Sequence, residues 1–189
     1  RPILASGKKN NPTLFIIDAA PDKMSSKRNE PLSGQSGQEL NYTYLQLARV
    51  SRSECYVTYC VKCRCERSGV DVKPAVSLID SCTIQHLIDE IYTIQPKIVI
   101  LSGAVACSLI PDIELELEHG FPRQADIYGW SCWIVPMYSP AIGMHETRYM
   151  IQLLEDWERL GKWLRGAWKP PVPASIPIRY TLIPPGGFW

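Results

Sequence analysis

The chain has 189 residues, of which 46% are hydrophobic, and it carries a formal net charge of +1 with an isoelectric point near 7.7. This size and apolar content predict one domain with a buried core, and no apolar run is long enough to span a membrane. The near-neutral charge neither supports nor excludes DNA binding, because a local basic stripe would not change the sum. Since no stretch resembles a signal peptide, we expect an intracellular protein, cytoplasmic or nucleoid-associated, without a membrane partner.

Short apolar runs predict four buried strands, at 13–19, 55–61, 97–101 and 130–138. Helical spacing of apolar residues predicts helices at 37–49, 82–95 and 144–168. The polar segment 21–36 is expected to be a loop, and the alternation of glutamate and leucine at 114–118 indicates an exposed strand or an extended loop. Strands that alternate with helices predict an α/β fold, a three-layer sandwich around a central four-stranded, mostly parallel sheet.

The stretch from Asp18 to Cys65 organises the predicted fold. Its first strand stops at Pro21, a glycine-bearing loop at 31–37 leads into a helix, and the chain returns as the second strand. This order presents backbone N–H groups and a helix N-terminus at one edge of the sheet. We therefore expect a site for a phosphate or a base at that edge.

The end of the chain has a different composition. Residues 169–189 contain six prolines without periodicity, so we divide the chain into a domain at 1–168 and a proline-rich C-terminal arm or linker at 169–189. The large aromatic residues Trp168, Phe188 and Trp189 favour a docked strap or a partner contact over a free linker.

Seven cysteines give an odd count, and in a reducing compartment they favour a metal site or free thiols over disulfides. Four of them gather around the end of the second strand: Cys60, Cys63, Cys65 and Cys82. Four thiolates in one region suit an iron-sulfur cluster or zinc. The alternative is a group of small, partly buried thiols that bind no metal.

Five short motifs are spaced along residues 13–165: Asp18-Ala-Ala-Pro-Asp22, Pro31-Leu-Ser-Gly-Gln-Ser-Gly37, Thr58-Tyr-Cys-Val-Lys-Cys63, Leu101-Ser-Gly-Ala104 and Tyr138-Ser-Pro140. In this order they resemble the uracil-DNA glycosylase superfamily, and in particular its iron-sulfur-containing, thermophile-type branch. The resemblance implies a glycosylase-like α/β sandwich that has a base pocket at its strand ends and DNA as its partner.

The resemblance also shows where this chain departs from the family. Ala19, with Ala20 beside it, stands where the family has a polar or acidic group, Tyr59 replaces the uracil-reading asparagine, Ser139 replaces a histidine, and Leu32 replaces the aromatic ring that stacks on the base. Cleavage of a glycosidic bond needs a group that stabilises the sugar cation and a donor for the departing base. We therefore expect the original reaction to be impaired.

The family's four-iron cluster uses an N-terminal Cys-x-x-Cys pair and two later cysteines, whose positions match Cys63 and Cys82. The N-terminal pair is absent here, and Cys60 and Cys65 are the residues that would replace it.

Residues expected to contact DNA phosphates lie in the loops of this edge: Lys23, Ser33, Gly34, Ser36, Lys62 and Arg64. Ile142 and Met144 lie in the loop that in the family enters the DNA stack, where an apolar wedge is suitable. The alternative is an ordinary solvated surface followed by the hydrophobic start of the last helix.

The leading hypothesis is a catalytically impaired glycosylase-like domain that binds DNA or docks another protein in replication or repair. The resemblance extends to degenerate members attached to polymerases, including viral ones. One alternative is an active DNA glycosylase with altered base specificity, for which Asp22 and Ser139 are the catalytic candidates, although an aspartate beside a strand end is more often a cap. The other alternative is a purely structural interaction module.

Overall fold

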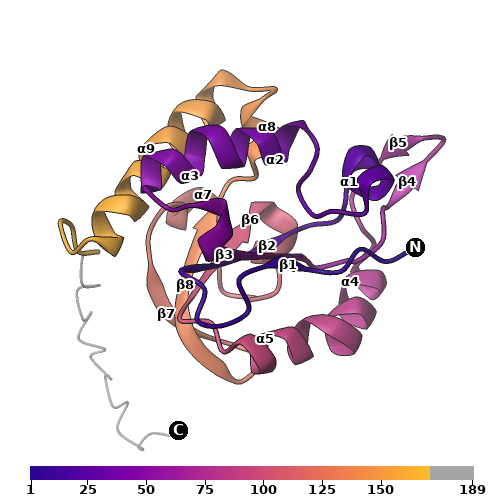
Figure 1. The fold of residues 1–189 in the computed structure, drawn as a ribbon, viewed down its shortest axis with the longest axis horizontal. Coiled ribbons are helices and arrows are strands. Elements are labelled where there is room, and N and C mark those ends of the chain that lie inside the picture. Colours follow the sequence, from indigo (N-terminus) through magenta and orange to yellow (C-terminus); the bar gives the residue numbers. More distant parts are fainter. Residues whose placement is uncertain (171–189) are drawn as a thin grey trace, which may run out of the picture.

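A six-stranded sheet lies at the centre of the computed structural model, which describes residues 1–170, and helices cover both of its faces (Figure 1). The strand order is β1-β3-β2-β6-β8-β7; the four inner strands are parallel and each edge strand is antiparallel to its neighbour. The strands are β1 (Ser6–Gly7), β2 (Leu14–Asp18), β3 (Cys55–Tyr59), β6 (Ile98–Ser102), β7 (Arg123–Ile127) and β8 (Trp130–Met137). This arrangement confirms the predicted three-layer α/β sandwich.

The prediction of four strands was incomplete, because it found the parallel strands and missed both edges. Strand β1 has only two residues, too few to produce a periodic signal. Strand β7 carries exposed polar residues and pairs with β8 through a turn at Tyr128 and Gly129, whose φ angles are 50° and 82°. Positive φ at both turn residues is typical of a tight hairpin.

One face of the sheet is covered by α2 (Gln35–Glu39), η1 (Leu40–Tyr44), α3 (Leu45–Ala48), α8 (Pro140–Gly143) and α9 (Thr147–Leu164) (Figure 1). The rings of Tyr44 and Trp157 stack in this core with centroids 6.3 Å apart. A Cβ atom at Gly161 would lie only 2.7 Å from the Cα atom of Ala48, so glycine allows α3 and α9 to pack closely. The buried aromatic pair and this close contact hold both helices against the sheet.

The other face is covered by α4 (Val76–Cys82), η3 (Thr83–Leu87), α5 (Ile88–Ile94) and α6 (Gly103–Cys107). Here Phe15 of β2 and Tyr56 of β3 stack with ring centroids 5.0 Å apart. The helix predicted at 82–95 begins six residues earlier than expected, at Val76. The last long helix begins at Thr147, whereas the prediction placed its start at residue 144.

Two short helices occupy segments for which the sequence analysis predicted no helix. The expected loop at 21–36 contains α1 (Lys23–Arg28), which begins after Asp22. The expected strand or extended loop at 114–118 is the helix α7 (Leu115–Glu118), and the Glu118 carboxylate accepts a hydrogen bond from the Glu114 N–H at 2.9 Å. Five alternating residues are too few to distinguish a strand from one helical turn.

Within residues 1–170, the structure contains no helix whose length and apolar character would let it cross a membrane. The predicted arm at 169–189 lies outside the described residues except for its first two positions.

Candidate functional site

The carboxyl ends of β2, β3, β6 and β8 meet at one edge of the sheet, because these strands are parallel. Asp18 at the end of β2 pairs with Tyr59 at the end of β3. Beyond the strands, the Cys60 N–H donates to the Asp18 carbonyl at 2.8 Å and the Val61 N–H donates to the Ala19 carbonyl at 3.0 Å. The first and third predicted motifs therefore lie side by side, as expected for a common site.

Tyr59 fills the space between β3 and the loop at 31–34. Its side chain is 1% exposed, and its hydroxyl accepts a hydrogen bond from the Leu32 N–H at 2.7 Å and donates to Ser25 Oγ at 3.3 Å. Burial raises the pKa of this hydroxyl, so it stays neutral. Leu32 is also buried, and these two predicted pocket residues therefore contact each other instead of lining an open base pocket.

Two glycines let the loop at 31–37 pack tightly. A Cβ atom at Gly37 would lie 1.6 Å from the Leu32 carbonyl oxygen, and one at Gly34 would lie 2.0 Å from Oδ2 of Asp22. Leu32 itself has a φ of 51°, a left-handed conformation that is unusual for leucine. The bond from its N–H to Tyr59 helps to hold this strained residue in place.

Asp18 is a buried carboxyl group at this edge. Its side chain is 8% exposed, and it accepts hydrogen bonds from the Ala19 N–H at 2.9 Å and from the hydroxyl of Ser102 on β6. Loss of solvation raises the pKa of Asp18 to about 6, and the neighbouring Asp22 carboxylate raises it further against the opposing effect of the hydrogen bonds. The sequence analysis did not identify the Ser102 contact.

Both catalytic candidates, Asp22 and Ser139, act as helix caps. Oδ1 of Asp22 accepts from the Ser25 N–H at 2.6 Å at the start of α1, and Oγ of Ser139 accepts from the Ala141 N–H at 3.3 Å at the start of α8. In sheet order, β6 separates the end of β2 from the end of β8, which leads to Ser139. Ser139 therefore lies apart from the Tyr59 and Leu32 pair.

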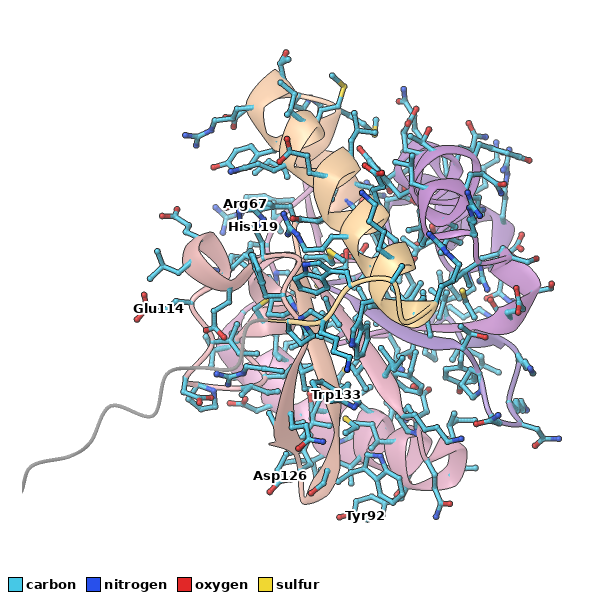
Figure 2. All side chains as sticks on the ribbon, turned by 90° about the vertical axis from the view of Figure 1, so that its left-hand side faces the viewer. Arg67, Tyr92, Glu114, His119, Asp126 and Trp133 are labelled. Atoms are coloured by element: carbon cyan, nitrogen blue, oxygen red, sulfur yellow. The ribbon has the colours of Figure 1, made fainter. Side chains whose placement is uncertain are left out.

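Ser139 lines a separate cavity of about 450 Å³ at the end of β8, together with Gly103, Tyr138 and Ile142. Gly103 has a φ of 83°, and a Cβ atom there would lie 3.1 Å from the Cβ atom of Ser139. Glu114 and Glu116 also line this cavity, and Figure 2 shows Glu114 on the outer side of the molecule. Two carboxylates make this cavity unsuitable for a DNA phosphate.

Lys62, which was predicted to contact DNA, does not present its charge to solvent. The residue is 4% exposed, its ammonium group lies 2.8 and 2.9 Å from the two carboxylate oxygens of Glu90 on α5, and it donates to Thr58. Burial lowers the pKa of Lys62, and the Glu90 carboxylate opposes this shift. The ion pair joins the end of β3 to the helical layer.

Arg64 is half-buried and paired with Asp71 and Glu66 in the hairpin formed by β4 (Glu66–Arg67) and β5 (Val70–Asp71). It also donates to the Gly69 carbonyl at 2.8 Å. The charge predicted to meet a phosphate is therefore compensated by two carboxylates.

The other residues predicted to contact DNA lie on α1, on the following loop and first turn of α2, and at α8 and its C-terminal end. Lys23 is exposed, and its N–H donates to the Asp71 carboxylate at 3.3 Å, which joins α1 to the hairpin (Figure 1). Gly34 is buried, whereas Ser33 and Ser36 are half-buried. Ile142 and Met144 are half-buried at α8, so each exposes part of an apolar side chain.

The four cysteines near the end of β3 do not form a metal site in the described part of the chain, where no three side chains of histidine, cysteine, aspartate or glutamate come together to hold a metal ion. Cys60 is completely buried, whereas Cys63, Cys65 and Cys82 are half-buried. Burial and the neighbouring Cys63 and Cys82 raise the pKa of Cys65, which favours the neutral thiol. The residues present thus do not fit the predicted iron-sulfur cluster or zinc ion.

His119, for which the sequence suggested no partner, belongs to a buried polar network. Its Nδ1 lies 2.6 Å from Asp156, which is fully buried and also accepts from Arg159 at 2.8 Å. The His119 ring lies 4.9 Å from the ring of Tyr138 beside the Ser139 cavity, and its contact with Asp156 places it against the middle of α9. No sequence pattern joins residues 37 positions apart, so only the fold shows this contact.

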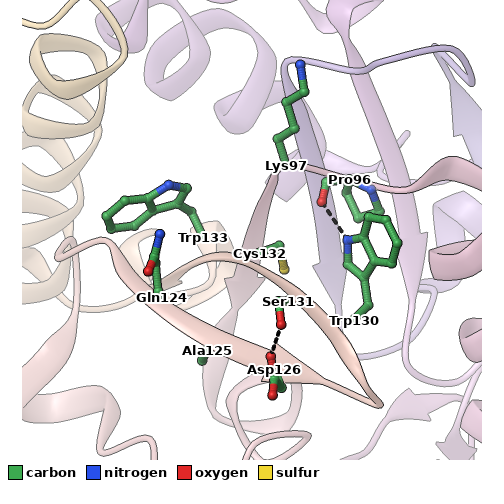
Figure 3. Close-up of a pocket in the computed structure, with 9 residues that line it drawn as sticks. All are labelled: Pro96, Lys97, Gln124, Ala125, Asp126, Trp130, Ser131, Cys132 and Trp133. Atoms are coloured by element: carbon green, nitrogen blue, oxygen red, sulfur yellow. Dashed lines mark hydrogen bonds between the residues drawn. The ribbon is translucent and has the colours of Figure 1, made fainter.

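A further cavity of about 650 Å³ lies at the opposite, amino-terminal edge of the sheet (Figure 3). It is lined by residues that include Lys97, Trp130 and Trp133. The indole N–H of Trp130 donates to the Pro96 carbonyl at 2.8 Å. This cavity contains no residue that the sequence analysis assigned to a site.

Comparisons with known proteins match most of the chain. The family model of the uracil DNA glycosylase superfamily matches residues 5–159. A protein of Saccharolobus solfataricus named type-4 uracil-DNA glycosylase is 25% identical over 153 residues, which cover 78% of this chain and 69% of that protein. The residues matched by the family model include the carboxyl ends of β2, β3, β6 and β8.

Proposed function

The chain belongs to the uracil-DNA glycosylase superfamily, and we propose that it uses this fold to bind DNA without excising uracil. The observation that carries the proposal is the position of Tyr59. Its ring and hydroxyl occupy the space beside the loop at 31–34, and both polar contacts of the hydroxyl are made within the protein. A base that entered this space would have to displace a buried tyrosine.

The remaining chemistry of the edge supports the same proposal. Glycosidic cleavage needs a group that stabilises positive charge on the sugar and a donor for the base. Ala19 supplies no such group, whereas Asp22 and Ser139 are engaged as caps. The polar side chains at this edge thus serve the fold.

The surface that we propose for DNA consists of the exposed lysines of α1, Lys23 and Lys27, of Ser36 in the first turn of α2, and of the apolar pair Ile142 and Met144. Lysine side chains contribute phosphate contacts that weaken with salt, and half-buried apolar side chains can enter a base stack. Such a role requires a location where DNA is present, the cytoplasm or the nucleoid. We include a partner protein of a replication or repair assembly in the same proposal.

Replacing both Lys23 and Lys27 with glutamine is expected to weaken duplex binding several-fold at low salt. It should also reduce the slope of log binding constant against log salt by about two, since each phosphate contact contributes ~0.9. A titration by fluorescence anisotropy at several salt concentrations measures both quantities. The matched control is the double change Lys97→Gln and Lys169→Gln, two exposed lysines outside this surface. If the unaltered protein shows no binding at low salt, the proposal is wrong and the purely structural interaction module is favoured.

The alternative, an active glycosylase with altered base specificity, is favoured by one observation. Asp18 is a carboxyl group at a strand end whose pKa is raised to about 6, which suits proton transfer near neutral pH. Its burial and its hydrogen bonds to Ala19 and Ser102 argue for a structural role. An excision assay with the unaltered protein and Asp18→Asn distinguishes the two.

A further inference from the structure

A polar cavity of about 520 Å³ lies between strand β1 and the loop that contains Pro31, Leu32 and Ser33. Its walls come from β1, the end of α1, the α2 and η1 helix, and the short helix η2 (Arg52–Glu54). The lining groups that carry charge or hydrogen-bonding capacity include Arg28, Arg52, Ser33, Asn41 and Glu30. Of these five residues, the sequence analysis assigned a role only to Ser33, as a phosphate contact, and the comparisons assign none to the cavity.

Two guanidinium groups line this cavity without a carboxylate partner. Arg28 donates to the Ser33 carbonyl at 2.9 Å, and Arg52 donates to Ser6 Oγ at 2.9 Å and to the Cys55 carbonyl at 3.5 Å. Among residues 1–170, neither forms an ion pair, in contrast to Arg64. Each guanidinium has five N–H donors, so most of them are available to an anion.

Burial lowers the pKa of Arg52, and the nearby Glu30 carboxylate partly opposes this effect. An arginine stays charged under all ordinary conditions, so this half-buried guanidinium is a poorly solvated positive charge. Such a charge attracts an anion more strongly than an exposed one, because water competes less for it. Glu30 reduces the positive charge of the cavity but does not cancel it.

Two buried polar atoms in the same walls have no partner. Ser33 Oγ and Asn41 Oδ1 are inaccessible to solvent and form no hydrogen bond with the described residues. Leaving such an atom unsatisfied costs about 1–3 kcal/mol, so unpaired buried groups call for an explanation. The hydroxyl of Ser33 can donate to an anion, whereas the carbonyl oxygen of Asn41 needs a donor. Because neither atom reaches the surface, a ligand can satisfy them only when the half-buried side chains of Ser33 and Asn41 turn toward the cavity, and it must then carry an acceptor and a donor.

Besides the guanidinium groups and the polar atoms, an aromatic ring, that of Tyr42, lines this cavity. The residue is 79% exposed, so its ring is accessible to a ligand there. An exposed aromatic face next to arginines is the arrangement on which a nucleobase stacks.

We propose that this cavity binds one nucleotide, with its phosphate at Arg28, Arg52 and Ser33 and its base on Tyr42. Guanidinium groups bind phosphate through paired N–H donors, and the base or sugar of a nucleotide provides the donor that Asn41 needs. Inorganic phosphate alone would leave Asn41 and Tyr42 without a contact. The nucleotide is either free or one unit of a single strand. This inference does not depend on the proposed DNA surface of α1, because it uses none of the same side chains.

The test is a calorimetric titration of the full chain with deoxyadenosine 5′-monophosphate, deoxyadenosine, inorganic phosphate and a short single-stranded oligodeoxyadenylate. The monophosphate is expected to bind more tightly than the nucleoside or phosphate. Arg28→Gln and Tyr42→Ala should each weaken it about tenfold, as for loss of a charge-assisted hydrogen bond or a stacking contact. Glu30→Gln should tighten it, since a repulsive carboxylate is removed. The matched control is Arg67→Gln, an exposed arginine of β4 outside the cavity, which should bind as the unaltered protein does.

Binding of the oligonucleotide alone, with the same losses in Arg28→Gln and Tyr42→Ala, assigns the cavity to one unit of a single strand. Absence of binding by every probe, or equal binding by all variants, overturns the inference. Because Arg28 and Tyr42 are exposed, their substitution is not expected to unfold the chain, and circular dichroism checks this. The lysine variants of α1 test the DNA proposal separately.

Discussion

Replacing Tyr59 with alanine is expected to lower the free energy of unfolding by about 3–5 kcal/mol, the range found when large core side chains are truncated. The ring is 1% exposed and lies among core residues, so its removal leaves a cavity. It also leaves the Leu32 N–H without its acceptor in a buried setting. Urea unfolding followed by circular dichroism measures the change.

The matched control for this prediction is Tyr42→Ala. Tyr42 is 79% exposed, so the same substitution should change stability by no more than about 0.5 kcal/mol. Tyr59→Phe isolates the hydroxyl and should cost about 1–3 kcal/mol, because the Leu32 N–H loses its partner while the ring stays. If Tyr59→Ala proves as mild as Tyr42→Ala, the ring does not fill the space beside the 31–34 loop.

Asp18→Asn is expected to stabilise the protein at neutral pH and to have little effect at acid pH. Burial raises the pKa of Asp18 from 3.8 to about 6, so the folded protein binds this proton more tightly than the unfolded chain does. The contribution of Asp18 to stability is therefore most favourable below about pH 4, falls as the pH rises from about 4 to 6, and stays constant above that range. At 1.36 kcal/mol per pKa unit, the free energy of unfolding that Asp18 contributes falls by about 3 kcal/mol between acid and neutral pH.

The free energy of unfolding of Asp18→Asn is compared with that of the unaltered protein across pH 4–7. The titrations of other carboxylates largely cancel in the difference between the two proteins. The matched control is Asp22→Asn, because asparagine also caps helices well. It should change stability only slightly across this range, through the small part that the Asp22 carboxylate adds to the raised pKa of Asp18. A constant difference between Asp18→Asn and the unaltered protein across the range would show that Asp18 titrates normally.

The parallel strands of the sheet could be predicted from sequence because burial on both faces leaves a direct signal. All five residues of β2 and of β3 are buried, and such strands appear as short continuous apolar runs. The edge strands β1 and β7 lack this signal, since one is very short and the other is half exposed. The helix α1 was missed because its residues are mostly polar, and its formation depends on the cap that Asp22 provides.

For the candidate site, the sequence predicted which residues lie near one another but not which contacts they make or how deeply they are buried. Sequence motifs placed Leu32 and Tyr59 near each other, but their hydrogen bond joins residues 27 positions apart and depends on the fold. Lys62 follows a strand and resembles an exposed loop lysine, yet Glu90 from α5 buries its charge. The cysteines were close in sequence, and sequence proximity alone did not produce the geometry of a metal site in the described residues.

The most direct test of the central claim is a single-turnover excision assay with excess protein on uracil-containing single strands and duplexes, run beside an active uracil-DNA glycosylase. Binding to the same oligonucleotides is measured in parallel. We expect salt-dependent binding and no abasic product, because Tyr59 fills the space beside the 31–34 loop and both catalytic candidates, Asp22 and Ser139, are engaged as helix caps. Release of uracil that is lost in Asp18→Asn or in Asp22→Asn would contradict this account. Neither change is expected to unfold the protein, so the inactivity of either variant would report lost chemistry.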